Sequence, residues 1–504
     1  MPLPLTLDYE SGAPLHHQLY EQMRGLILCG KLSSGKRLPS TRLLADSLGL
    51  ARATVAESYD RLSSEGYIVT VPKSGTYVSD SLPDHLLSSA PVNERLSVAP
   101  SKTEGLERLS AFGRAVLSCD TSFQRSYQEI NFGYGPPEME YFPLETWRRL
   151  LLNHCRDATS PVFAYCVDYA GHVGLREAVA AYLSRSRAVK CHADQVVVVN
   201  GSQQAIDLVA RVLLDRGDYA AMEDPGYFPM RQCAMAQGAN IFPVPVDEQG
   251  MVVSHLPSAP SPRMKMVYVT PSHQYPTGTV LPLARRLELL AWAAQNQVMV
   301  LEDDYDSEFR YAGRPLPSLQ GIDNSDCVIY AGTFSKIMFP SVRVGYLVVP
   351  EHMATVFTKA KVLADRQAPM LEQYALADFI NEGHMERHIR KMRLVYEKRR
   401  NATVATLKEV FGECVAVLGE NSGMSVLARF NTGLDDQQVI ELARTEKVGI
   451  ITASPCYYEG YEPGEFLLGY SNLSEEKIRE GIRRLHIALK PVLKPVAASA
   501  ERSA

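Results

Sequence analysis

Five short apolar runs constrain the fold of this chain more than any other feature of its sequence. They lie at residues 196–199, 266–269, 298–301, 328–331 and 346–349. Segments of helical character separate them, which is the pattern of an α/β domain with a mostly parallel sheet. After about residue 364 the pattern changes to a long helix and then mixed short elements. We therefore predict a large α/β part at about 165–360 and a smaller α+β subdomain at about 365–495.

The first 79 residues have a different pattern, three helical segments followed by a β-hairpin. Apolar residues recur at helical spacing in each segment, Gly30 ends the first, and Ser40 can cap the start of the second. The third helix covers about residues 52–65, and the hairpin turns at residues 73–75. This order of elements predicts a winged helix-turn-helix over residues 1–79.

The region between these two parts reads as a linker. Residues 80–121 are rich in Ser, Pro and Ala and lack a sustained period, so we expect at most one short helical patch there. A chain of 504 residues is also too long for one ordinary core, since compact domains hold roughly 100–200 residues. We therefore expect separate folding units at 1–79 and 122–495, with a loose tail from about Pro491.

A winged helix-turn-helix presents the start of its third helix to the major groove of DNA. At that start Arg52 can reach a guanine, while the second-helix start and the wing offer groups suited to phosphates. The net charge gives no support for DNA binding, because it is −5 and residues 1–80 hold as many acids as bases. Alternatively, Ser40 and Thr54 only cap helices and the arginines are solvated. The candidate phosphate contacts are Ser40, Thr41, Arg42 and Lys73.

Residues 14–78 resemble the winged helix of GntR-type regulators. The resemblance rests on Gly30-Lys31-Leu32, on Leu-Pro-Ser-Thr-Arg-Leu-Leu-Ala at 38–45, on the run at 48–55 and on Glu65-Gly66. It implies binding to double-stranded operator DNA. The contact positions that it implies are Arg42, Arg52, Thr54 and the wing residue Gly75.

Three segments of the α/β part place polar groups at the ends of strands. Residues 200–204 join a strand to a helix whose first amides are available to a phosphate. Residues 302–305 place carboxylates at the carboxyl end of a strand, where α/β folds bind ligands. Lys336 follows a third strand, between hydroxyls and Arg343, where it can form a Schiff base beside a phosphate. Taken singly, a surface lysine or a solvated acid cluster would explain each of them.

In this order the three segments resemble the fold-type I aspartate aminotransferase superfamily, over residues 126–490. The resemblance implies pyridoxal 5′-phosphate as the cofactor and Lys336 as its Schiff-base lysine. It also implies that Asp303 pairs with the pyridine nitrogen, keeping it protonated, that Tyr305 bonds the phenolic oxygen and that Tyr227 stacks on the ring. The groups implied around the phosphate are Gly201, Ser202, Gln203, Thr333, Ser335 and Arg343.

Two positions depart from that superfamily. Tyr275 stands where aminotransferases usually carry an asparagine, so His273 or Gln274 is expected to contact the phenolic oxygen instead. Leu467 stands where catalytic relatives hold an arginine for the substrate carboxylate. The loss of a bidentate carboxylate anchor argues against ordinary turnover of α-amino acids. The arginines that could compensate are Arg231 and Arg429.

Together the two modules resemble the MocR subfamily of GntR-type regulators, a match that includes residues 302–311 and 383–390. The resemblance implies a homodimeric transcription regulator whose cofactor-binding domain senses an amine or amino acid. Two alternatives stay open. One is a sensor of pyridoxal 5′-phosphate itself that controls vitamin B6 metabolism, and the other is a working aminotransferase with an appended DNA-binding head.

The composition favours a cytoplasmic protein. No apolar run approaches the ~20 residues that a membrane span needs, and residues 1–10 carry acids rather than the basic start of a signal peptide. The nine cysteines are an odd number without metal-ligand spacing. Reduced thiols are therefore expected, and no metal site is predicted.

Overall fold

The computed structural model describes residues 4–8, 11–72, 74–80, 106–119, 128–133, 135–156, 161–165, 168–311 and 316–495. The chain divides into two compact units, Met1–Glu107 and Arg108–Ala504, and each is described by itself. None of the helices in the described ranges combines the length and the apolar character that a bilayer crossing requires.

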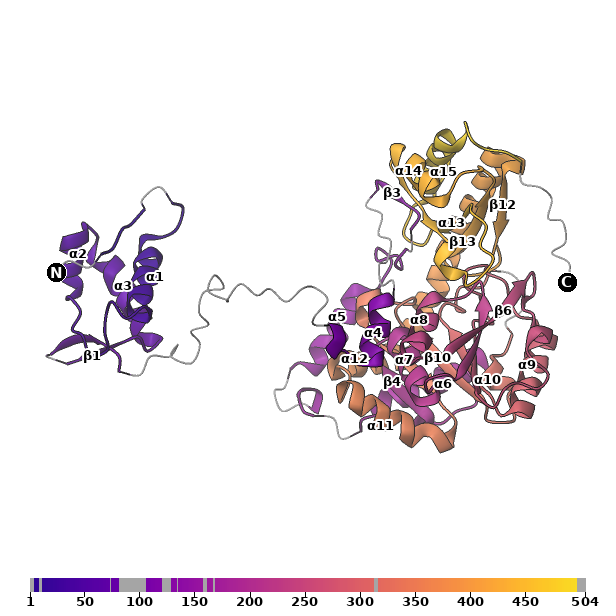
Figure 1. The fold of residues 1–504 in the computed structure, drawn as a ribbon, viewed down its shortest axis with the longest axis horizontal. Coiled ribbons are helices and arrows are strands. Elements are labelled where there is room, and N and C mark those ends of the chain that lie inside the picture. The colour runs from indigo at the N-terminus through magenta and orange to yellow at the C-terminus, as the bar shows by residue number, and fades with distance from the viewer. Residues whose placement is uncertain are drawn as a thin grey trace. The chain divides into compact units, whose positions relative to one another are not determined.

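The first unit contains the predicted winged helix (Figure 1). The helices α1 (Leu15–Leu28), α2 (Thr41–Leu48) and α3 (Arg52–Ser64) pack around one apolar core. The strands β1 (Ile68–Val71) and β2 (Gly75–Val78) pair antiparallel to form the wing. The architecture predicted from the helical and strand-like periods is therefore confirmed.

The second unit is built on a central sheet. Across this sheet the described strands follow the order β4 (Val196–Val199), β11 (Gly345–Val348), β10 (Val328–Thr333), β9 (Met299–Asp304), β8 (Met264–Val269), β5 (Tyr219–Asp224), β6 (Asn240–Asp247) and β7 (Gly250–Met251). The strands from β10 to β6 run parallel, whereas β11 and β7 run antiparallel to their neighbours. The sheet is thus mixed but mostly parallel, and the predicted α/β fold is confirmed.

Two layers of helices cover this sheet. One layer consists of α5 (Leu144–His154), α6 (Val173–Arg187) and α12 (Met370–Asn381), and the other of α7 (Ser202–Leu213), α8 (Phe228–Ala236) and α11 (Ala354–Asp365). The valines of β4 show why both layers are needed, because alternate side chains of a strand point to opposite faces. Val196 and Val198 face the first layer, and Val197 and Val199 face the second. Two further helices, α9 (Leu283–Asn296) and α10 (Leu319–Ile322), pack beside β9 and β10.

The small subdomain lies at one end of this large part (Figure 1). Its antiparallel sheet has the order β12 (Val415–Leu418), β13 (Ser425–Phe430), β16 (Glu465–Gly469) and β15 (Ile451–Thr452). The helices α14 (Asp436–Thr445) and α15 (Glu475–Leu489) pack on it. The long helix α13 (His384–Phe411) starts in the core of the large part and continues into that of the small one.

Long-range packing adds three features to the sequence-based outline. β3 (Ile130–Asn131) pairs with β14 (Val448–Gly449), so the start of the second unit packs with the small subdomain. α4 (Ala111–Ser118) falls within the predicted linker and packs near α8. Most other residues of that linker lie outside the described ranges. α12 follows residue 365, yet it packs in the large part.

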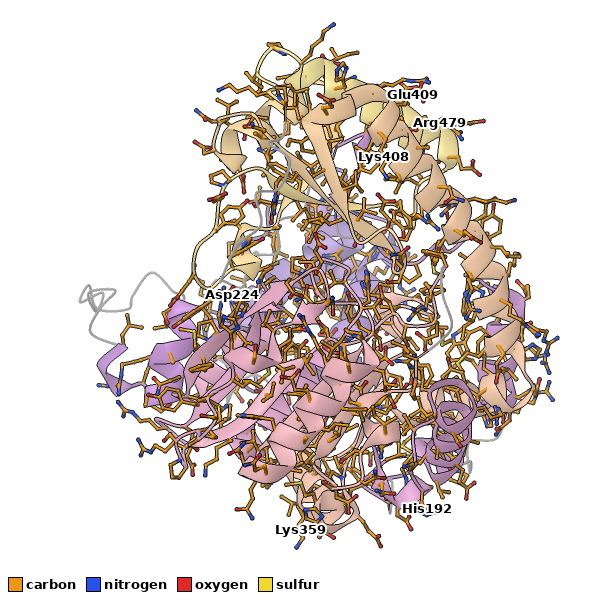
Figure 2. All side chains as sticks on the ribbon, turned by 90° about the vertical axis from the view of Figure 1, so that its right-hand side faces the viewer. His192, Asp224, Lys359, Lys408, Glu409 and Arg479 are labelled. Carbon is orange, nitrogen blue, oxygen red and sulfur yellow. The ribbon has the colours of Figure 1, made fainter. Side chains whose placement is uncertain are left out.

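Asp224 joins the two parts of the second unit (Figure 2). It ends β5, and its carboxylate accepts hydrogen bonds from the backbone amides of Tyr458 and Glu459 at 2.8 and 3.1 Å. These amides belong to a loop of the small subdomain between β15 and β16. The strand ends of the central sheet are therefore held next to the small subdomain.

Candidate functional site

A cavity of about 620 Å³ lies at the carboxyl ends of β9 and β10. Pockets for small organic ligands usually measure ~300–1,000 Å³, so the size suits a cofactor. Side chains from several separate segments of the chain converge on it. The predicted cofactor residues that line it are Ser202, Gln203, Tyr227, Asp303, Tyr305, Thr333, Ser335, Lys336 and Arg343.

Lys336 occupies the turn that follows β10 and lines the cavity. The amine lies in the interior of the unit, and this desolvation lowers the pKa of Lys336 to about 8. The nearby carboxylate of Asp306 acts in the opposite direction, because it favours the ammonium form. A larger share of neutral amine is therefore present near neutral pH than for a solvated lysine, and the neutral amine is the nucleophile.

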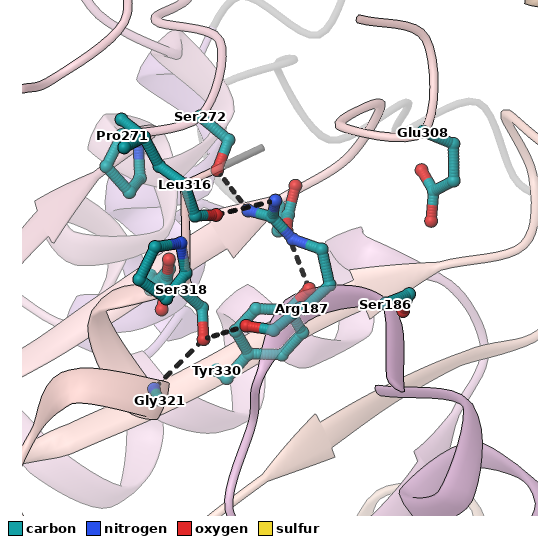
Figure 3. Close-up of polar contacts among 12 residues, drawn as sticks. Ser186, Arg187, Pro271, Ser272, Glu308, Leu316, Ser318, Gly321 and Tyr330 are labelled. Carbon is teal, nitrogen blue, oxygen red and sulfur yellow. Dashed lines mark hydrogen bonds and ion pairs between the residues drawn. The ribbon is translucent and has the colours of Figure 1, made fainter. Parts of the chain in front are cut away.

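The two adjacent aspartates at the end of β9 have different surroundings. Asp304 accepts hydrogen bonds from Arg187 Nε at 2.7 Å and from the Tyr330 hydroxyl at 2.6 Å. Arg187 is held in turn by Ser272 and by the carbonyl oxygen of Leu316 at 3.3 Å (Figure 3). Asp304 is thus a partner in a buried ion pair away from the cavity, whereas Asp303 lines the cavity.

Asp303 retains hydrogen-bonding capacity toward a ligand. One of its oxygens accepts a bond of 2.7 Å from the buried Tyr268 hydroxyl, and the other, Oδ1, has no partner among the described residues. Burial and the charges of Asp304 and Asp306 raise the pKa of Asp303 to about 7. A protonated pyridine nitrogen would supply both the missing donor and the opposite charge. Asp303 therefore fits the role that the sequence predicts for it.

The opposite end of the cavity is suited to a phosphate. Ser202 starts α7, whose first amides point out of the helix end, and Gly201 precedes it with a φ of +84°. The guanidinium of Arg343 donates to the carbonyl oxygen of Asn200 at 2.6 Å, and a Cβ on Gly201 would lie 3.0 Å from its Nη2. Ser335 Oγ is buried without a partner among the described residues. These groups provide hydrogen-bond donors and a positive charge for an anion.

His273 and Gln274 do not line the main cavity. The Gln274 amide donates to the carbonyl oxygens of Pro225 and Tyr275, both at 2.7 Å, and its oxygen accepts from Thr277. Gln274 therefore stabilises its own loop and joins it to the segment that follows β5. His273 Nδ1 lies 2.9 Å from Asp306 and 3.1 Å from the Tyr305 hydroxyl, so it can act on a ligand through Tyr305. Tyr275, at the position expected to be asparagine, does line the cavity.

Leu467 lies at the small-subdomain side of the site. It is buried in β16 and lines a small cavity of about 30 Å³ that also touches Lys336. Arg231 donates to the carbonyl oxygens of Tyr457 and Pro455, both at 2.8 Å. Arg429 pairs with Glu465 and, like Arg231, lines neither cavity. The two arginines that could replace the carboxylate anchor are therefore engaged elsewhere.

Several cavity residues escaped sequence reasoning. Tyr268 and Thr270 belong to β8 and its end, where Tyr268 read as one more apolar member of a buried strand. Its hydroxyl meets Asp303 because β8 and β9 are neighbours in the sheet. In the sequence, only the expected parallel order of these strands could have indicated that Tyr268 lies beside Asp303. Gly135 and Pro136 reach the cavity from the segment after β3.

The predicted DNA contacts of the first unit lie mainly on its surface. Arg42 and Arg52 are exposed, at the starts of α2 and α3. Ser40 caps α2 by accepting from the Leu43 amide at 3.2 Å, so the capping role considered for it is present. Thr41 and Thr54 are partly exposed, and Lys73 lies outside the described residues.

Gly75 has a structural role in the wing. Its φ of +133° is one that side chains rarely adopt. A Cβ there would also lie 2.8 Å from the guanidinium Nε of Arg37. The glycine therefore allows Arg37 to pack against the start of β2.

Comparison with known proteins agrees with both units. The model of bacterial regulatory proteins of the gntR family matches residues 15–78, and that of aminotransferase class I and II matches residues 129–485. The probable rhizopine catabolism regulatory protein MocR of Rhizobium meliloti is 38% identical over 96% of this chain and 95% of its own length. The pyridoxine biosynthesis regulator PdxR of Corynebacterium glutamicum is 31% identical over 81% and 82%.

Among solved structures, the α-aminoadipate aminotransferase LysN of Thermus thermophilus superposes with a TM-score of 0.67 and 29% identity, covering 77% of this chain and 96% of that protein. The aminotransferase class I and II family depends on pyridoxal phosphate. The regulators MocR and PdxR match 96% and 81% of this chain, and the enzyme covers 77% of it. The chain therefore belongs to the MocR subfamily of GntR-type regulators, in which a winged helix-turn-helix is joined to an aminotransferase-like domain.

Proposed function

We propose that this chain is a homodimeric transcription regulator that holds pyridoxal 5′-phosphate at Lys336 and changes its binding to operator DNA when an amine or amino acid occupies the same cavity. One observation carries this proposal. The cavity gathers a lysine of lowered pKa, a buried carboxylate oxygen without a partner among the described residues, and an end whose groups are suited to a phosphate. The same chain carries a winged helix at its N-terminus.

When bound, pyridoxal 5′-phosphate supplies an aldehyde carbon that condenses reversibly with a primary amine and releases water. The residues of this chain position that carbon. Arg343, Ser335 and the start of α7 would hold the phosphate, and Asp303 would hold the pyridine nitrogen. Lys336 and a ligand amine then compete for one position. Because Lys336 lies between the large part and the small subdomain, its release can bias the arrangement of the two parts.

The first test measures the attachment of the cofactor. We expect purified protein to show an absorbance band in the near-visible range, and borohydride reduction with peptide mapping to place the adduct on Lys336. Lys336→Ala should lose this adduct, while Asp304→Glu, a change at a residue away from the cavity, should keep it. An adduct on another lysine in cofactor-saturated protein contradicts the assignment.

The second test separates an amine sensor from its two alternatives. A duplex selected from a random pool by the protein itself serves as operator, and its affinity is measured without cofactor, with cofactor, and with cofactor plus amine. A change on adding cofactor alone favours a sensor of pyridoxal 5′-phosphate, an alternative that the similarity to PdxR supports. Sustained keto-acid production from an amino donor and 2-oxoglutarate favours an enzyme. The amine sensor requires a change that depends on the amine and on Lys336.

A further inference from the structure

The cavity changes character at its small-subdomain end. Leu467 is 6% exposed and lies in the middle of a four-stranded antiparallel sheet. Its partners in register are Leu427 of β13 and Ile451 of β15. The small cavity beside Lys336 is therefore bordered at Leu467 by a position with aliphatic partners on both neighbouring strands.

The positive charges of the site lie elsewhere. Among the described residues that line the main and the adjoining small cavity, the cationic side chains are Lys336 and Arg343. Arg343 is held at the phosphate end by the carbonyl oxygen of Asn200, and Lys336 is the amine that a ligand must displace. Arg231 and Arg429 bind backbone carbonyls and Glu465 instead. No cation in the described lining is thus available for a ligand carboxylate.

The lining offers aromatic rings and neutral polar groups in place of charge. Tyr227 and Tyr275 pack edge to face, with ring centroids 5.4 Å apart, and Tyr275 and Tyr305 do so at 6.3 Å. Phe228 and Pro229 extend the apolar wall, and the phenol hydroxyls can bond a ligand hydroxyl. A carboxylate placed there would lose its hydration without gaining an ion pair, which is costly.

We propose that the ligand sensed by this chain is a primary amine without a carboxylate, with an apolar, aromatic or hydroxyl-bearing body. This inference rests on the proposed function and specifies the ligand class of the same site. The amine meets the cofactor position beside Lys336, and the body of the ligand lies against Leu467 and the tyrosines. An α-amino acid of the same side chain fits the volume but brings a charge that these residues do not balance.

Matched pairs of ligands test this proposal on full-length protein loaded with cofactor. Tyramine is compared with tyrosine, 2-phenylethylamine with phenylalanine, and ethanolamine with serine, by titrating the absorbance band and the operator affinity. We expect each amine to bind roughly tenfold to a hundredfold more tightly than its amino acid, the range expected when a charged group lacks its hydrogen-bonded partner. Equal or tighter binding of the amino acids overturns the inference and leaves the proposed function intact. No response to any of the six compounds contradicts the proposed function itself.

A reciprocal variant sharpens the test. Leu467→Arg places a cation where the carboxylate would lie, so the preference should shift toward the amino acid in each pair. Leu467→Met, which keeps the size and the apolar character, should retain the preference of the natural chain. Thermal unfolding and cofactor absorbance of both variants show whether the site remains assembled. An unchanged preference in a folded, cofactor-loaded Leu467→Arg protein contradicts the assigned position.

Discussion

The proposed DNA-reading surface, at the starts of α2 and α3, and the proposed cofactor cavity hold their charged side chains in opposite ways. Arg42 and Arg52 are exposed to solvent, at helix starts. Asp303 is buried and lines the cavity, and its Oδ1 has no partner among the described residues. Asp304 beside it is buried in an ion pair with Arg187, although its own Oδ1 also lacks a partner there. A surface side chain that is already hydrated costs the fold little, whereas a buried charge must be balanced. We therefore expect the loss of a buried ionic partner to lower stability, and the loss of an exposed arginine to lower binding alone.

The largest expected effect separates the two adjacent aspartates at the end of β9. Asp304→Asn leaves the buried Arg187 without its ionic partner, and the loss of one partner of a buried pair costs about 3–5 kcal/mol. Asp303→Asn should not lower the free energy of unfolding, because it keeps the bond with Tyr268 and removes a buried carboxylate of raised pKa. It should weaken cofactor binding instead. Chemical denaturation and cofactor titration of both variants check this, and equal loss of stability would remove the distinction between the two residues.

The next effect concerns pH at the cofactor site. The neutral form of Lys336 attacks the aldehyde, and burial lowers its pKa to about 8. The rate of cofactor attachment to cofactor-free protein should therefore rise with pH and level off above about 8, rather than continue toward the ordinary value of 10.5. Asp306→Asn should shift the plateau to lower pH, because the carboxylate favours the ammonium form. Stopped-flow absorbance measures these rates, and a rise that continues through pH 10 contradicts the assigned environment.

On the DNA-reading surface, Arg52→Ala should weaken specific operator binding by about 1–3 kcal/mol, the value of a base contact by arginine. The side chain is exposed, so unfolding and cofactor absorbance should remain unchanged. Arg61 provides a control on the same helix, since it pairs with Glu65 near the other end of α3. Arg61→Ala should leave operator affinity close to that of the natural chain. Fluorescence anisotropy at fixed salt compares the two, and equal losses would show that α3 does not read DNA through its start.

The sequence predicted those elements whose pattern is local. The helices of the first unit follow from apolar spacing and from Ser40 and Gly49 at the ends of α2, and the buried strands read as apolar runs. The candidate site residues on the strand ends were predicted because their order in the sequence is characteristic, and the structure brings them together at one cavity. Resemblance supplied their roles, and the geometry then separated Asp303 from Asp304.

Features that depend on pairing over long distances could not be predicted in this way. β3 has two residues and finds its partner more than 300 residues later, so no local period marks it. The bond between Arg187 and Asp304 joins residues 117 positions apart. Gln274 was expected at the cofactor, but its amide donates to the carbonyl oxygens of Pro225 and Tyr275, which only three-dimensional contacts reveal. Each of these contacts is set by strand order and loop packing rather than by neighbouring residues.

The smallest predicted effect concerns Ser40, which caps α2 and is also a candidate phosphate contact. Ser40→Ala removes the acceptor of the Leu43 amide and should destabilise the first unit by about 1 kcal/mol. Ser40→Asp retains a capping acceptor but adds a negative charge, so stability should stay near that of the natural chain. Operator affinity then tests whether Ser40 also contacts a DNA phosphate. If Ser40 faces a phosphate, Ser40→Asp weakens DNA binding more than Ser40→Ala does, because the carboxylate repels the phosphate. If both variants bind DNA equally well, Ser40 acts only as a cap, and the DNA-reading surface at this position is limited to Thr41 and Arg42.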